Sequence, residues 1–217
     1  MSTATRAALL VICISVCAQA QTRSLALYSG LAQGLDPEAG QTLQVELQRL
    51  LAPAGVELIW KNSGEIKAGE DFDLVAVSSF EGSCSVSEPP PSAAGFAGTS
   101  GASLGDTSIS GGRVLPFFRI DCGRLVRILK PALETLDPRS RQALLGRALA
   151  RVMAHEIYHI VGETAEHQYS GVAKASFSLR DLLSSRFDFD ISSLAKMRPD
   201  SQVTFSGSPD LVESTGR

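Results

Sequence analysis

The chain lacks an excess of positive charge. Its 217 residues contain 20 Lys and Arg against 23 Asp and Glu, which gives a formal net charge of −3, and no basic cluster is present. Nucleic acid is therefore excluded as an expected partner. Long hydrophobic runs are also missing beyond the first twenty residues, so no membrane span is expected in the mature chain.

The apolar run at the N-terminus is typical of a signal peptide. An arginine among the first six residues supplies the positive start, residues 7–17 are apolar but too short to span a bilayer, and residues 18–20 read Ala-Gln-Ala, a small-x-small cleavage site. Cleavage after Ala20 predicts a secreted or periplasmic protein, whose net charge becomes −4 because that arginine is lost. A lipid anchor at Cys17 is disfavoured, since the preceding Val16 is bulky where a small residue is expected.

Cysteine is scarce in the mature chain, which keeps only Cys84 and Cys122. An even pair in an oxidising compartment favours a disulfide between them. The alternative is two unpaired buried thiols.

Histidine is also scarce: the chain has three, and they lie within thirteen positions of one another. His155 and His159 are four residues apart, so on a helix they present their imidazoles to one metal ion. Glu156 lies one step round the helix, beside the metal rather than on it, where it can act as a general base toward a water. The alternative without a metal site is an amphipathic helix whose histidines only make hydrogen bonds.

The helix that carries the pair is well signalled. Asp137 is a predicted N-cap and Pro138 suits the first helical position. Apolar residues then recur at helical spacing, at Leu144, Leu145, Ala148, Leu149, Val152, Met153, Ile157 and Ile160. Gly162 predicts the end of the helix, and a turn there can bring His167 back as a third ligand. Three protein ligands with one open position are typical of catalytic rather than structural zinc.

The segment His155-Glu156-Ile157-Tyr158-His159-Ile160-Val161-Gly162 resembles the zincin metallopeptidases, and its glycine is similar to the metzincin branch. In that branch the third histidine follows the glycine by three residues. Here that place is Ala165 and the histidine comes two residues later, which implies a longer loop. The resemblance covers about residues 138–171, with Met197 ahead of Pro199 as a weak Met-turn candidate.

The rest of the chain predicts an α+β fold of α/β type. A strand, a helix, and two further strands are expected, at residues 24–29, 36–51, 56–60 and 72–80. The helix opens with an Asp-Pro pair, and its apolar stripe consists of Leu43, Leu47, Leu50 and Leu51. The resemblance implies a zincin-like arrangement: a twisted mixed sheet with a packed helix, then the active-site helix and a small C-terminal subdomain. The predicted domain is 21–197, with short helices near 179–183 and 191–197 and a disordered tail at 198–217.

Residues 81–112 are rich in Gly, Pro and Ser, which predicts a long surface loop. It is either an irregular insertion tied down by Cys84 or a rim of the substrate cleft, so the role of residues 86–112 stays open. A strand over 114–121 follows, and Pro116 is compatible either with an edge strand or with the first residues of a strand. A peptide substrate of a zincin pairs with such an edge strand. A helix over 124–136, kinked or split by Pro131, leads to Asp137.

These features predict an exported zinc metalloendopeptidase that hydrolyses a peptide or protein substrate, with Zn²⁺ held by the three histidines and Glu156 as catalytic base. Tyr169 is the nearest candidate for stabilising the oxyanion, although an ordinary loop tyrosine is the alternative. If His167 is not the third ligand, Glu163 or Glu166 is next in line. A non-catalytic zinc-binding domain and a zinc amide hydrolase acting on non-protein substrates are the rival functions, and a monomer is expected.

Overall fold

The computed structural model describes residues 22–30, 34–62, 64, 69–86 and 103–198. The expected signal peptide and its cleavage site, most of the 86–112 segment, and the expected tail beyond residue 198 lie outside these ranges. Within them, no helix combines the length and apolarity that crossing a membrane requires.

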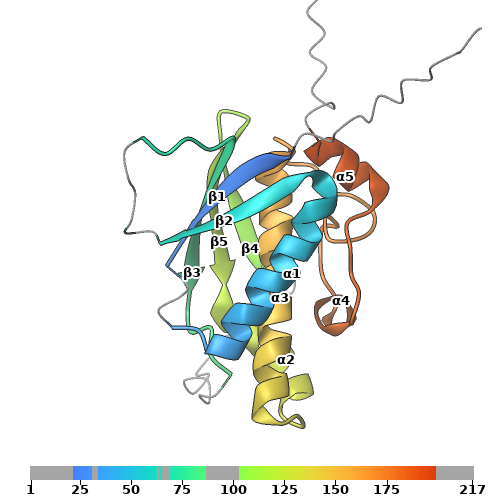
Figure 1. The fold of residues 1–217 in the computed structure, drawn as a ribbon. Coiled ribbons are helices and arrows are strands. Elements are labelled where there is room, and N and C mark those ends of the chain that lie inside the picture. The colour runs from blue at the N-terminus through green and yellow to red at the C-terminus, as the bar shows by residue number, and fades with distance from the viewer. Residues whose placement is uncertain (1–21, 31–33, 63, 65–68, 87–102, 199–217) are drawn as a thin grey trace, which may run out of the picture.

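A five-stranded mixed sheet forms one layer of the molecule (Figure 1). Its strands are β1 (Arg23–Ser29), β2 (Val56–Asn62), β3 (Leu74–Glu81), β4 (Gly105–Ser110) and β5 (Arg113–Asp121). They are ordered β2-β1-β3-β5-β4, with β2, β1, β3 and β5 parallel and β4 antiparallel to β5. The α+β fold expected from the sequence is confirmed, as is the opening order of strand, helix, strand, strand.

Two long helices pack together against the sheet, α1 (Pro37–Leu51) and α3 (Pro138–Val161). Both begin with an Asp-Pro pair: the Asp36 carboxylate accepts from the Glu38 N–H at 2.9 Å, and the Asp137 carboxylate accepts from the Ser140 N–H at 3.0 Å. The first residue of each is proline, whose missing N–H would have no partner there. A short 3₁₀ turn, η2 (Ala52–Ala54), leads from α1 to β2.

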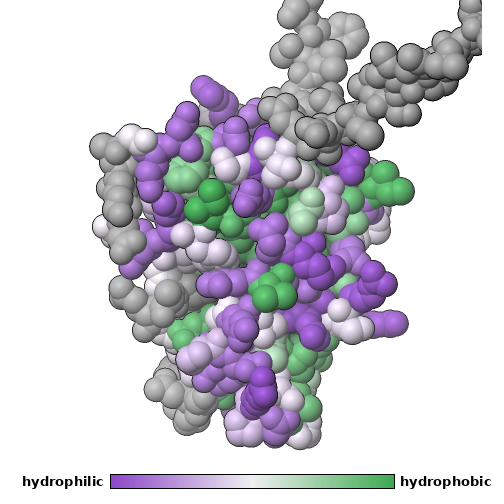
Figure 2. All heavy atoms as spheres, in the orientation of Figure 1, coloured by the Kyte–Doolittle hydropathy of each residue, from purple (hydrophilic) through white to green (hydrophobic). Residues whose placement is uncertain are grey.

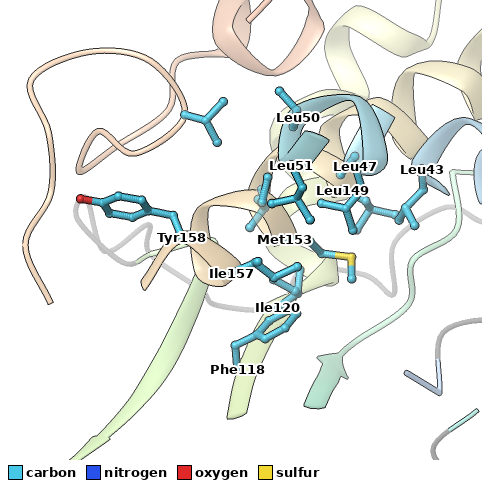
Figure 3. Packing of buried hydrophobic residues seen from close by; sticks show 14 of the residues in the cluster. Leu43, Leu47, Leu50, Leu51, Phe118, Ile120, Leu149, Met153, Ile157 and Tyr158 are labelled. Carbon is cyan, nitrogen blue, oxygen red and sulfur yellow. The ribbon is translucent and has the colours of Figure 1, made fainter. Parts of the chain in front are cut away.

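The core lies between these helices and the sheet. Figure 3 shows side chains from α1, α3 and β5 in contact, and the labelled ones are Leu43, Leu47, Leu50, Leu51, Phe118, Ile120, Leu149, Met153, Ile157 and Tyr158. The apolar stripes predicted for both helices are therefore the buried ones. The outward side differs: the face seen in Figure 2 is largely hydrophilic, with hydrophobic residues in separate groups.

Of the two expectations for Pro116, the sheet edge is wrong, because β4 and not β5 is the outer strand. Pro116 instead lies among the first residues of β5. Part of the expected 81–112 loop, Gly105–Ser110, pairs with β5 and covers its outer side. Pro116 is tolerated inside the sheet because the ladder from β5 to β3 begins at Phe117 and the ladder to β4 is irregular between Thr107 and Ile109. The position that lacks an N–H therefore lies before the ladder to β3 begins and within the irregular part of the ladder to β4.

Helix α2 (Cys122–Leu133) connects the sheet to α3. Pro131 lies in its last turn and does not split it, in contrast to one of the two expectations from the sequence. The predicted disulfide is confirmed: Cys84, after β3, is bonded to Cys122, the first residue of α2, with their Cα atoms 4.9 Å apart. It ties the start of the 86–112 segment to the end of β5.

The C-terminal part contains two short helices, α4 (Leu179–Leu183) and α5 (Ile191–Met197), close to their predicted positions. Arg151 of α3 attaches this part to the two long helices, and its side chain is fully buried. Its guanidinium donates to Glu46 of α1 at 3.1 Å and to the backbone carbonyls of Asp181 and Ser184 at 2.6 and 2.8 Å. A small C-terminal subdomain therefore packs against the end of α3 that carries the histidines.

Candidate metal centre

Helix α3 brings two of the three histidines together. His155 and His159 lie in its last two turns and are almost fully buried, at 7% and 6% exposure. Their ring centroids are 4.8 Å apart. The helical spacing in the sequence therefore predicted this pair correctly.

Backbone carbonyls fix the orientation of both rings. Nδ1 of His155 lies 2.8 Å from the carbonyl oxygen of Val172, and Nδ1 of His159 lies 2.7 Å from that of Thr164. A carbonyl only accepts, so each Nδ1 carries the proton and donates it. Each Nε2 is then left with a lone pair, the arrangement in which a second partner orients a metal-ligating histidine.

The two Nε2 atoms face each other at 3.2 Å. Burial lowers the pKa of His155 to about 4 and also lowers the pKa of His159, so both rings are neutral near pH 7. Two lone pairs at this distance cannot form a hydrogen bond, whereas a cation between them satisfies both. The separation fits one tetrahedral ion with bonds of 2.0–2.1 Å, whose ligand atoms lie roughly 3.3–3.4 Å apart.

His167 completes the group. One ligand nitrogen from each of the three histidines lies within 4.8 Å of the others, so the three could hold a metal ion, as predicted. The His167 ring stacks on His155 at a centroid distance of 5.1 Å and meets His159 edge-on at 4.9 Å. Unlike the other two, it is exposed.

The turn after α3 accommodates the longer spacing to His167. The helix ends as predicted, but Gly162 keeps a right-handed conformation, with φ −86°, and the left-handed residue is Glu163, with φ 46°. A left-handed glutamate is strained. Next to His167, Gln168 donates from Nε2 to the Tyr158 hydroxyl at 3.1 Å and accepts from Ser192 of α5 at 3.1 Å. These contacts hold the loop against α3.

Glu156 lies beneath the edge strand. Its side chain is 2% exposed, and its Oε2 accepts a hydrogen bond from the Thr107 hydroxyl of β4 at 2.8 Å. Burial raises the pKa of Glu156 to about 7, although the Thr107 hydrogen bond opposes the rise, and the nearby charge of Asp106 adds to it. Such a carboxyl group gains and loses a proton near neutral pH, which suits a general acid or base.

A cleft of about 270 Å³ opens beside His155 and Glu156. Apolar and cationic side chains share its lining with backbone of β4; the residues are Ser103, Leu104, Gly105, Arg124, Ile128, Val152, Lys174, Ala175, Ser176 and Phe177. Lys174 is already paired with Asp181 at 2.6 Å. His155 and the buried carboxylate of Glu156 therefore border one open space.

Two further candidates from the sequence are Tyr169 and Met197. The Tyr169 side chain is fully exposed, at 105%, which leaves its predicted role as oxyanion stabiliser without support from burial. Met197 is the last residue of α5, and its carbonyl accepts from Arg23, so it belongs to a helix end rather than a turn. Conversely, sequence reasoning missed Thr107 and Gly105, because nothing in their Gly- and Ser-rich surroundings singles them out.

No model of a known protein family matches the chain, and a search of curated proteins found no match either.

Proposed function

We propose that this chain is a zinc-dependent peptidase in which Glu156 is the general base. The observation that carries the proposal is the pair of Nε2 lone pairs, 3.2 Å apart, with a buried carboxylate on the intervening helical turn. A site that only bound zinc for stability would be closed by a fourth ligand and would have no use for the carboxylate.

Zinc held by His155, His159 and His167 would supply a Lewis acid that polarises a carbonyl and lowers the pKa of a water to about 7. The chain's own residues supply the proton transfer. Oε2 of Glu156 is engaged by Thr107, so Oε1 is the oxygen left to accept the proton of the attacking water. The same carboxyl group then donates that proton to the leaving amine.

The edge strand supports a peptide as the substrate. The Leu104 carbonyl accepts from the Asp121 N–H at 2.9 Å and Asp106 pairs with Arg119, so residues 104 and 106 use their backbone groups toward β5. In an antiparallel ladder the residue between them, Gly105, points its N–H and carbonyl away from β5. There the carbonyl accepts from the Ser103 hydroxyl and the N–H donates to the same oxygen at 3.4 Å. An extended peptide that displaces this hydroxyl can pair with both groups directly above Glu156.

The zincin resemblance belongs with these observations. A mixed sheet with a packed helix, followed by the histidine-bearing helix and a small C-terminal part, is the arrangement that the resemblance implied. The bonded cysteine pair is consistent with an oxidising environment outside the cytoplasm, as the proposed export requires.

The decisive variant is Glu156→Gln in the mature, disulfide-bonded protein. The amide has the same shape and is not a ligand, so fold and zinc content should be kept. Turnover of a peptide should fall by about 10²–10⁴-fold, in kcat rather than KM, because a positioned general base is lost. The wild-type activity must first be abolished by a chelator and restored by zinc.

Two results would favour the rival functions. A wild-type protein that binds zinc tightly but cleaves nothing across a broad peptide library is a binding domain. If it cleaves only non-protein amides, and Glu156→Gln abolishes that, it is an amide hydrolase with the same base.

A further inference from the structure

Strand β4 lies against the carboxylate of Glu156 with two residues that share one face of the strand. Thr107 and Gly105 are two positions apart on the strand, so both face α3. The Thr107 hydroxyl donates to Oε2 at 2.8 Å and lies 3.2 Å from the backbone carbonyl oxygen of Glu156. The hydroxyl therefore contacts both the side chain and the backbone of one helical residue.

Gly105 leaves room for the other carboxylate oxygen, Oε1, because it has no side chain. A Cβ atom added to Gly105 would lie 2.7 Å from Oε1 of Glu156, closer than side-chain carbons approach a neighbour. It would also meet the Arg119 carbonyl oxygen and Ile120 at 3.0 Å. Gly105 and Glu156 both line the cleft beside His155. The missing side chain thus leaves space around Oε1 on the cleft side.

We propose that Thr107 and Gly105 are positioning residues for Glu156: Thr107 holds Oε2 in place, and Gly105 keeps Oε1 clear for the water that it deprotonates. This inference rests on the proposed peptidase function. It predicts that the geometry of the base depends on an edge strand that carries none of the metal ligands. Without the hydroxyl, Glu156 can rotate about its side-chain bonds and Oε1 no longer points consistently at the cleft.

The test compares Thr107→Val, which removes the hydroxyl and keeps the shape, with Thr107→Ser, which keeps the hydroxyl. For the zinc-loaded mature protein, kcat for a peptide should fall about 10- to 100-fold in the valine variant, on the order of a lost hydrogen bond to a charged group. KM and zinc stoichiometry should change less than about twofold, and the serine variant should stay within about threefold of wild type. Ser110→Ala, an exposed position on the same strand, is the matched control and should leave kcat unchanged.

Two further variants keep the test independent of the folding of Thr107→Val. Gly105→Ala should lower kcat with zinc retained, since its new Cβ displaces Oε1. Thr107→Ala replaces the valine variant if the latter does not fold. In the Glu156→Gln background, Thr107→Val should cause no further loss, because a residue that acts through Glu156 has nothing left to position.

The outcomes separate the two proposals. If Glu156→Gln is inactive while Thr107→Val keeps kcat within about twofold, the positioning role is overturned and the peptidase stands. If the serine and valine variants lose kcat equally, the hydroxyl is not the operative group, and the role is again overturned. If the zinc-loaded wild type cleaves no peptide, the peptidase function fails, and the positioning role fails with it.

Discussion

At the residue scale, the three histidines differ in how firmly the fold holds them. His155 and His159 are buried, and each has a backbone carbonyl on its Nδ1. His167 is exposed and depends on its neighbour Gln168, which bridges Tyr158 and Ser192. The first two are thus fixed by their places on the buried helix and by carbonyls of the segment after it, and the third by contacts between the loop and two helices.

His167→Ala tests whether the exposed histidine is a ligand. Loss of a residue that only orients a ligand lowers metal affinity roughly 10- to 100-fold. His167→Ala removes a ligand itself, so zinc affinity should fall by more than that. Competition with a chromophoric chelator measures the affinity, and Tyr169→Phe serves as the control, because that exposed side chain should not affect zinc binding. Unchanged affinity would assign the third ligand elsewhere, and Glu166→Gln would be examined next. The Glu166 carboxylate lies 2.6 Å from the Lys196 ammonium, which argues against it as a ligand.

The sequence predicted the residues whose partners are local and missed those whose partners are distant. His155, Glu156 and His159 are related by helical geometry alone, so their spacing sufficed. Thr107 is 49 positions from Glu156, and its role exists only once β4 lies over α3. No periodic pattern reports a contact of that kind.

At the element scale, helices were easier to predict than the sheet edge. Asp-Pro starts and apolar stripes placed α1 and α3, because caps and periodicity act within one element. Strand β4 reads Gly-Asp-Thr-Ser-Ile-Ser, with little β-propensity and one apolar residue. Pairing with β5 makes it a strand, and the same pairing excludes β5 from the sheet edge, one of the two positions that Pro116 allowed.

The packing of α1 on α3 depends on Gly146. A Cβ added there would lie 2.2 Å from the backbone carbonyl oxygen of Ala39, which cannot move without shifting α1. Gly146→Ala should therefore destabilise the protein by about 1–3 kcal/mol, despite the better helix propensity of alanine. Urea unfolding measures the change.

Gly40→Ala on the partner helix is the matched control. An added Cβ there meets only Leu35 Cδ2, at 4.0 Å, so the same substitution should stabilise the protein by roughly 0.5–1 kcal/mol. Equal effects of the two variants would contradict the close approach of the helices at Gly146.

At the scale of the whole molecule, covalent and ionic links hold the outer parts to the core. Buried Arg151 joins α3, α1 and the C-terminal part, and its pair with Glu46 extends through Arg49 to Asp188. Burial opposes ionisation of Glu46, but its hydrogen bonds from Arg49 and the charges of both arginines keep its pKa below the usual value. These links place the C-terminal carbonyls and His167 relative to α3, so the site is a property of the complete fold.

The disulfide should contribute measurably to stability. It joins cysteines 38 positions apart, and closing such a loop is worth about 3–4 kcal/mol in the chain-entropy model. Thiol titration of the unfolded, unreduced mature protein should find no free thiol, and Cys84→Ser with Cys122→Ser should lower the free energy of unfolding by that amount. Reduction of the wild type should reproduce the loss. Two free thiols per chain would contradict the bond.

Metal removal should lower stability without unfolding the molecule, because the buried core of the two long helices and the sheet forms without any contribution from the histidines. Zinc that binds only the native state stabilises it by about 2.7 kcal/mol at a free concentration of 100 Kd. A chelator should therefore lower Tm by on the order of 5–10 °C and leave the far-ultraviolet circular dichroism at 25 °C unchanged, and added zinc should restore Tm.

The double variant His155→Ala with His159→Ala is the control, and its Tm should respond neither to the chelator nor to zinc. Loss of the helical signal on chelation would mean that the metal is structural, and an equal Tm shift in the double variant would mean that the chelator acts elsewhere. A folded metal-free state with the ligands already oriented by Val172 and Thr164 is what a preformed catalytic site requires.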